Sequence, residues 1–126
     1  MGNHKQVRVK LYDGNVLPEI DKPLVKLVQL LNRPGLWTTY CCQGDKTFYP
    51  DAYISVSGPL ARHLIHRLLD DQLDHPTRLG RCITFFESVP GEPIFIIRWH
   101  ARDLKSVTAG FKRVLSEKTF NIKYDQ

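Results

Sequence analysis

The fold is predicted best from the stretch Leu31-Asn32-Arg33-Pro34-Gly35-Leu36-Trp37-Thr38-Thr39-Tyr40-Cys41-Cys42-Gln43-Gly44-Asp45. A helix should end at Pro34-Gly35, because proline cannot continue a helix and glycine adopts the positive φ of a helix terminus. Residues 36–42 are rich in Trp, Thr and Tyr, which is typical of a strand. Gly44 then turns the chain. The other elements are placed around this helix, strand and turn.

The flanking sequence shows two patterns of apolar residues, one with the period of a strand and one with the period of a helix. Apolar residues alternate at 7–12, which predicts a strand that breaks at Asp13-Gly14-Asn15. Residues 21–31 and 103–115 carry helical stripes, and we expect Asp21 and Asp103 to cap these helices. The same patterns predict a helix at 57–75, strands at 52–57, 81–89 and 94–99, and a hairpin turn at 90–93. The tail, 119–126, is either an edge strand or a packed end.

This order predicts one α+β domain over residues 1–126. Its first six elements match a ferredoxin-like antiparallel sheet, β-α-β-β-α-β, and the C-terminal hairpin strand and helix extend it. The strand at 94–99 is apolar on both faces up to Arg98. Either the last helix or a second copy of the chain should cover the second face. A homodimer would use Ile94 and Ile96, or Phe95 and Ile97.

Composition narrows the class of protein. With 42% hydrophobic and 25% charged residues, the chain has the balance of an ordinary globular protein, which argues against disorder. No apolar run approaches the roughly 18 residues of a membrane helix, and the N-terminus lacks the apolar core of a signal peptide. We therefore expect a cytoplasmic protein without membrane contact. The three cysteines suit a reducing compartment, and the net charge of +5 favours anionic partners.

The pattern Leu31-Asn32-x-x-Gly35-Leu36-x-Thr38 followed by Cys42-x-Gly44 resembles a motif of small, mostly uncharacterised phage and bacterial proteins. Its turn is also similar to that of the tRNA wybutosine-synthesis methyltransferase family. The resemblance implies that Cys42 and Gly44 define the site. Cys41 stands where serine is common, and Asp45 stands where those families carry histidine or another basic residue, so Asp45 is not carried over.

The candidate ligand-binding residues lie at the turn and on one later strand: Thr39, Tyr40, Cys42, Gly44, Arg98 and His100. Hydroxyls and exposed N–H groups of such a turn can hold an anion or a polar ring. Arg98 sits inside an apolar strand, where an unpaired charge is costly, so it should meet a partner or an anionic ligand. Trp37, Tyr40, Trp99 and His100 could stack on a base. The competing interpretation is that the cysteines are small buried hydrophobes and Gly44 only turns the loop.

Catalytic and metal sites are weaker interpretations. Adjacent cysteines on a strand point to opposite faces, so Cys41 and Cys42 do not converge on a metal with His100. A Cys–His nucleophile pair has no further support, and neither a Walker loop nor a Gly-x-Gly-x-x-Gly motif occurs. Enzyme activity stays open, with a non-enzymatic role preferred, and no cofactor is assigned.

The favoured hypothesis is a binding protein for a small anionic, nucleotide-like ligand, such as a phage protein that sequesters a host nucleotide signal. The methyltransferase resemblance supports an alternative, an RNA-binding or RNA-modifying protein. A third hypothesis is a protein-interaction module that inhibits a host protein through the apolar hairpin strand.

Overall fold

The computed structural model describes residues 6–42, 51–75, 83–87 and 90–121, and these form an α+β fold. The strands are β1 Gln6–Lys10, β2 Val16–Asp21, β3 Trp37–Cys42, β4 Asp51–Ser57, β5 Ile83–Glu87 and β6 Ile94–His100. The α-helices are α1 Val25–Leu31, α2 Ala61–Asp74 and α3 Leu104–Leu115. Short 3-10 turns occupy Lys22–Leu24, Ala101–Asp103 and Lys118–Asn121.

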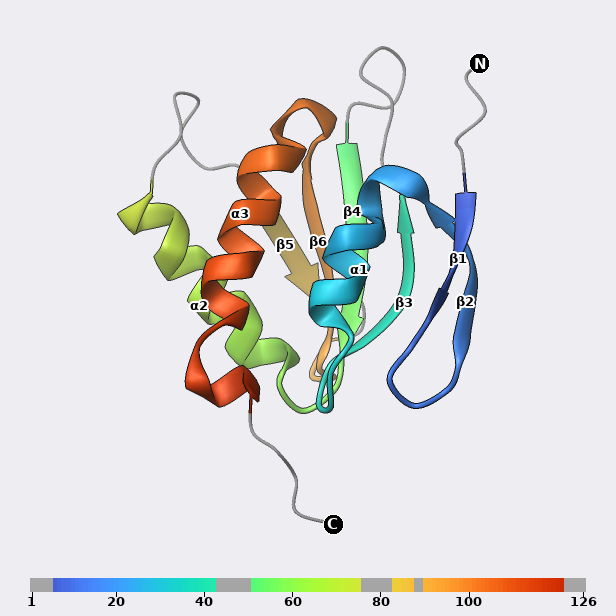
Figure 1. The fold of residues 1–126 in the computed structure, drawn as a ribbon. Coiled ribbons are helices and arrows are strands. Elements are labelled where there is room, and N and C mark those ends of the chain that lie inside the picture. Colours follow the sequence, from blue (N-terminus) through green and yellow to red (C-terminus); the bar gives the residue numbers. More distant parts are fainter. Residues whose placement is uncertain (1–5, 43–50, 76–82, 88–89, 122–126) are drawn as a thin grey trace.

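Two antiparallel sheets organise the described residues (Figure 1). The larger sheet has the strand order β3-β4-β6-β5, and β1 pairs with β2 in a separate two-stranded sheet. The α+β class with antiparallel pairing is thus confirmed. The ferredoxin-like order is not confirmed, because that order requires the first strand inside the main sheet.

A hairpin explains the difference. Residues 13–15 do not simply break the first strand. They turn the chain back, with Gly14 at a φ of 90° and the Leu11 backbone N–H donating to the Asn15 carbonyl at 2.7 Å. The chain then pairs locally, Lys10 with Val16 and Val7 with Ile20. A glycine at positive φ between two short apolar runs is a hairpin signal, and here β1 pairs with β2 in a separate sheet.

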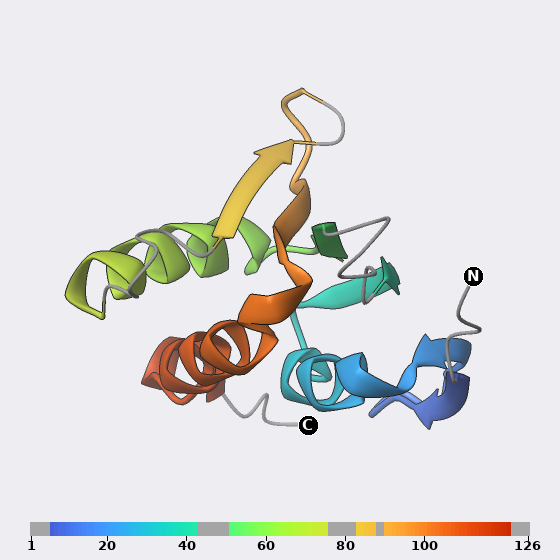
Figure 2. The ribbon, with the colours of Figure 1, turned by 90° about the horizontal axis from the view of Figure 1, so that it is seen from above.

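The three α-helices lie on one face of the main sheet, and α3 lies between α1 and α2 (Figures 1 and 2). Alternate residues of β4 and β6, such as Ile54, Val56, Phe95 and Ile97, are fully or almost fully buried and belong to the core. The last helix therefore does not cover the second face of the sheet. The predicted homodimer face of Phe95 and Ile97 is therefore wrong, because the chain's own core buries both side chains. A homodimer through Ile94 and Ile96 stays a prediction.

The second face of the sheet mixes burial with exposure. Ser55 and Ile96 are buried, Ile94 is half-buried, and Arg98 is exposed. The two-sided apolar character predicted for residues 94–97 is therefore confirmed, but it ends before Arg98. No helix in the described part of the chain is long and apolar enough to span a bilayer.

Both predicted aspartate caps are wrong, since neither Asp21 nor Asp103 makes a capping bond with its side chain. Asp21 is the last residue of β2, and its carboxylate accepts a hydrogen bond from the Gln6 side chain at 3.1 Å. At the later turn, the side chain of His100 accepts the Arg102 backbone N–H instead. Part of the tail, Lys118–Asn121, forms a 3-10 turn rather than an edge strand, and residues 122–126 lie outside the described residues.

Candidate functional site

The predicted turn is only partly described. Gly44 lies outside the described residues, and the side chains of Thr39, Tyr40 and Cys42 are not described either. Their backbone belongs to β3, where the pairing with β4 shifts register between Thr38 and Cys41. Their role as ligand contacts stays a prediction.

The sheet register aligns Cys42 and Arg98. Cys42 pairs with Tyr53 of β4, and Tyr53 pairs with Arg98 of β6, so the three positions form one cross-strand row. Two strand spacings separate Cys42 from Arg98, about 10 Å between backbones. Of the predicted site residues, Cys42 and Arg98 thus lie in the same row of the sheet, with the β4 strand between them.

The burial argument for Arg98 is wrong. Its side chain is exposed, since the strand leaves the apolar core after Ile97, and the cost of a buried unpaired charge does not arise. His100 is half-buried, and its Nδ1 accepts the backbone N–H of Arg102 at 3.1 Å. Trp99 is 2% exposed and packs in the core, so it cannot stack on a ligand's base as expected.

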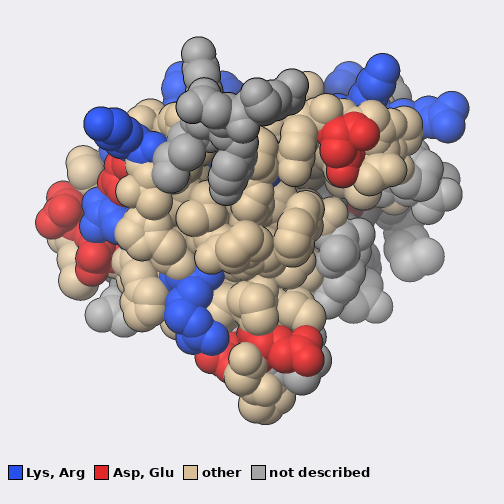
Figure 3. All heavy atoms as spheres, turned by 90° about the horizontal axis from the view of Figure 1, so that it is seen from below, with Lys and Arg blue, Asp and Glu red and all other residues tan. Residues whose placement is uncertain are grey.

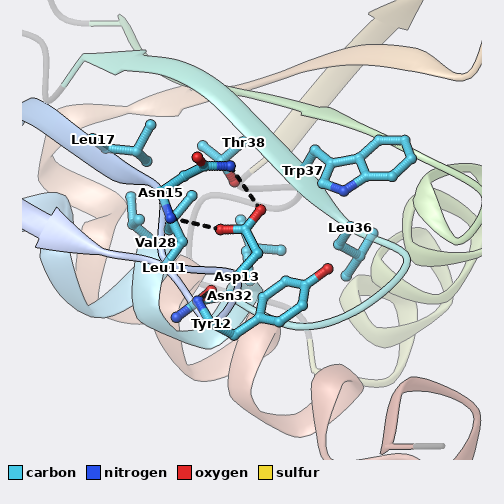
Figure 4. Close-up of a pocket in the computed structure, with 11 residues that line it drawn as sticks. Leu11, Tyr12, Asp13, Asn15, Leu17, Val28, Asn32, Leu36, Trp37 and Thr38 are labelled. Carbon is cyan, nitrogen blue, oxygen red and sulfur yellow. Dashed lines mark hydrogen bonds between the residues drawn. The ribbon is translucent and has the colours of Figure 1, made fainter. Parts of the chain in front are cut away.

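A pocket of about 330 Å³ lies between the β1–β2 hairpin, α1 and the start of β3 (Figure 4). We call it the hairpin pocket. Its volume lies at the lower end of the range for small-molecule sites. The residues that line it are Leu11, Tyr12, Asp13, Asn15, Leu17, Val28, Leu31, Asn32, Leu36, Trp37 and Thr38.

The hairpin turn supplies polar groups at the rim. The backbone N–H of Asn15 donates to Asp13 Oδ1 at 3.0 Å, and the Asn15 side-chain amide donates to Asp13 Oδ2 at 2.8 Å. The Tyr12 backbone N–H donates to Asn32 Oδ1 at 2.7 Å, which ties the turn to the end of α1. These bonds hold the Asp13 carboxylate among the lining residues, as Figure 4 shows.

Two aromatic side chains border the pocket on the same side (Figure 4). Tyr12 and Trp37 are each 51% exposed, so half of each residue is open to solvent beside the pocket. Trp37 lies against Gly58, because a Cβ built at Gly58 would stand 3.0 Å from Cε3 of the indole. The missing side chain at Gly58 therefore lets the indole pack closely against the backbone there.

Thr38 contributes a buried hydroxyl. The residue is 9% exposed, and its Oγ1 has no hydrogen-bond partner within the described structure. A buried hydroxyl without a partner costs roughly 1–3 kcal/mol relative to a satisfied one. Such groups are uncommon in native proteins and call for an explanation, such as a ligand atom or a water molecule.

The pocket has one carboxylate, and neither lysine nor arginine is among its lining residues. The face on which the hairpin turn and the start of β3 lie is viewed in Figure 3, and charged residues surround an uncharged centre there. The described residues contain no group of three or more His, Cys, Asp or Glu side chains arranged to hold a metal ion. The pocket can stack a planar ring and accept hydrogen bonds, and its rim is not built to neutralise an anion.

Sequence reasoning found part of this site. Trp37 was expected to stack on a base, and it is the exposed aromatic of β3. Tyr12, Asp13 and Asn15 were missed, because residues 13–15 were interpreted as a strand break and not as a hairpin turn that carries side chains into a pocket. The Asp-Gly-Asn triplet was the signal that could have identified them.

No family model, curated protein or solved structure matches this chain.

Proposed function

We propose that this chain is a non-enzymatic binding protein for a small nucleotide-like ligand, whose planar ring occupies the hairpin pocket. The observation that carries the proposal is the pairing of two half-exposed aromatic side chains with a buried, unpartnered Thr38 hydroxyl around one pocket. Stacking on aromatic side chains stabilises a bound base by about 1–3 kcal/mol. The polar groups of Asp13 and Asn15 at the rim then favour those planar rings that can hydrogen-bond to them.

The lining residues favour binding over chemistry. They supply amide, hydroxyl and carboxylate groups on an apolar floor of leucine and valine, and cysteine, histidine and lysine are not among them. The groups in the lining that can transfer a proton are the Asp13 carboxylate and the Tyr12 phenol, and neither histidine nor cysteine, the usual bases and nucleophiles, stands beside them. Sequestration of a nucleotide-like signal, as in the phage hypothesis, requires binding alone.

The anionic part of such a ligand need not enter the pocket. The net charge of +5 attracts anions over the whole molecule and raises their encounter rate. Arg98 and His100 lie on β6, away from the lining residues. A phosphate should therefore add a salt-sensitive contribution to the binding free energy, while the ring decides where the ligand binds.

Tryptophan fluorescence tests this function, because Trp37 is half-exposed and Trp99 is buried. Titration with a panel of nucleosides and nucleotides should give saturable quenching for at least one of them, and a Trp37→Phe variant should lose that quenching. A panel that gives no saturable signal up to millimolar ligand overturns the proposal.

A further inference from the structure

We propose that the surface formed by α1, α3 and the 3-10 turns before them binds the phosphate backbone of a nucleic acid duplex. We call this surface the basic face, and its cations are Lys22, Lys26, Arg102, Lys105 and Lys112. None of them lines the hairpin pocket, so this is a second function on a different surface. It does not depend on the ligand proposed for the pocket.

The fold brings these cations together from distant parts of the sequence. The helices α1 and α3 pack against each other and run in the same direction from the same end of the molecule (Figures 1 and 2). Lys26 is the second residue of α1 and Lys105 is the second residue of α3, so both lie at that end. Lys112 follows two turns later on the same side of α3, about 10 Å along the helix axis. All five side chains of the basic face are exposed.

The basic face carries little negative charge. Neither α1 nor α3 contains an acidic residue. Within residues 22–31 and 101–115 the one acidic residue is Asp103, which is half-buried in the turn before α3. The five cations form no ion pair with another described residue. Their mutual repulsion therefore favours an anionic partner.

The neighbouring helix has the opposite pattern. Two arginines and three aspartates occur in α2, and both arginines form ion pairs with carboxylates of the chain. Arg113 of α3 likewise points to α2, where it donates to Asp71. Lys112 is one residue earlier and therefore projects about 100° away around the helix. The cations without a carboxylate partner are thus concentrated on the exposed side of α1 and α3.

The uncharged residues of the basic face favour a duplex over a membrane or a single strand. Apart from the charged residues, the exposed residues of α1 and α3 are Gln29, Ser106 and Ala109. Helices that bind a membrane surface insert large apolar side chains, and single-strand sites stack bases on aromatic rings. The exposed large apolar residues in the described part of the chain lie elsewhere, and they are Tyr12, Val16, Trp37, Leu73 and Phe85.

The spacing of the helices suits a duplex. Packed helices have axes about 8–10 Å apart, so the cations of α1 and those of α3 form two rows at roughly that separation. The grooves of a DNA duplex are about 6–12 Å wide, which lets the two rows contact phosphates of both strands. Five neutralised phosphates would make the logarithm of the binding constant fall with the logarithm of the salt concentration, with a slope of about −4 to −5.

Fluorescence anisotropy with a labelled DNA duplex of mixed sequence tests the inference on the full chain. Binding should weaken with this slope between about 50 and 200 mM salt. The double variant Lys26→Gln and Lys105→Gln should bind about tenfold or more weakly at the low end of that range, with a slope smaller by about 2. The matched control is Lys10→Gln with Lys118→Gln, which removes the same charge from exposed positions outside the basic face and should keep the slope.

An RNA duplex forms the second arm of the titration. Binding of either duplex supports the inference, and the tighter one identifies the kind of nucleic acid. The inference is overturned if neither duplex binds at about 50 mM salt, or if the two double variants lose affinity equally. Tighter binding of the single strand than of its duplex, or binding of phosphatidylserine vesicles without binding of a duplex, also overturns it. Quenching of Trp37 by nucleotides is measured separately, so each of the two proposals can fail alone.

Discussion

At the scale of single residues, Thr38 shows how a site can be built at the expense of stability. Its hydroxyl is buried on β3, and it has no hydrogen-bond partner in the described structure. Valine has nearly the same shape without the hydroxyl. A polar atom at such a position is satisfied by a ligand atom or by a water molecule, and valine would need neither.

Thr38→Val should therefore stabilise the free protein, by about 1 kcal/mol, because it removes an unsatisfied buried group. The same substitution should weaken binding of the ligand that Thr38 contacts. Urea denaturation measures the first effect and titration the second. A loss of stability in the variant would mean that the hydroxyl already has a partner in the free protein.

At the scale of elements, ion pairs join α2 to α3 and to the turn that follows it. Arg113 donates twice to Asp71, from Nε at 2.9 Å and from a terminal nitrogen at 2.8 Å. Asp71 is 8% exposed, and a Cβ built at Gly110 would stand 3.2 Å from its Oδ2. The close approach of α2 and α3 thus depends on the missing side chain at Gly110 and on the hydrogen bonds that Arg113 donates to Asp71.

Arg113→Ala should destabilise the fold by about 1–3 kcal/mol, because it leaves the buried Asp71 carboxylate without its cation. Removal of the neighbouring exposed charge by Lys112→Ala should cost under about 0.5 kcal/mol. Thermal or urea unfolding of the two variants measures the difference. Equal effects would show that Asp71 does not depend on Arg113.

A second pair predicts a dependence on pH. Arg67 donates two hydrogen bonds to Glu117, at 2.8 and 2.7 Å, and this holds the pKa of Glu117 below its ordinary value. A carboxyl whose pKa is lowered by folding stabilises the protein above its unfolded pKa of roughly 4.3, and the contribution is lost as pH falls through the folded value.

Stability should therefore fall as the pH drops below about 4.3, the unfolded pKa, and it should fall less in a Glu117→Gln variant. Glu87, whose pKa is lowered by the Gly91 N–H and Arg62, contributes with the same sign. Urea midpoints measured across this range provide the comparison. If the urea midpoints of the unaltered chain and of Glu117→Gln fall equally with pH, the Arg67–Glu117 pair does not stabilise the fold.

At the scale of the whole molecule, local pattern predicted most elements and did not predict how they pair. The stripe that ends at Leu31, the strand after Leu36 and the hairpin of β5 with β6 follow from period and turn chemistry, and the structure has them. The order of strands in a sheet depends on pairing between residues distant in sequence, such as that of β4 with β6. The spacing of apolar residues within one strand does not specify its partner. The pocket was missed for the same reason, since its walls come from three separate elements.

The proposed function requires that a planar ring binds beside Trp37. NMR spectroscopy of the indole N–H groups tests it most directly, because the chain has two tryptophans and only Trp37 lines the pocket. Saturation with the nucleoside or nucleotide of the panel that quenches Trp37 fluorescence should shift the indole signal of Trp37, assigned with Trp37→Phe, and leave that of the buried Trp99 in place. An unchanged Trp37 signal, or a shift confined to Trp99, would contradict the claim.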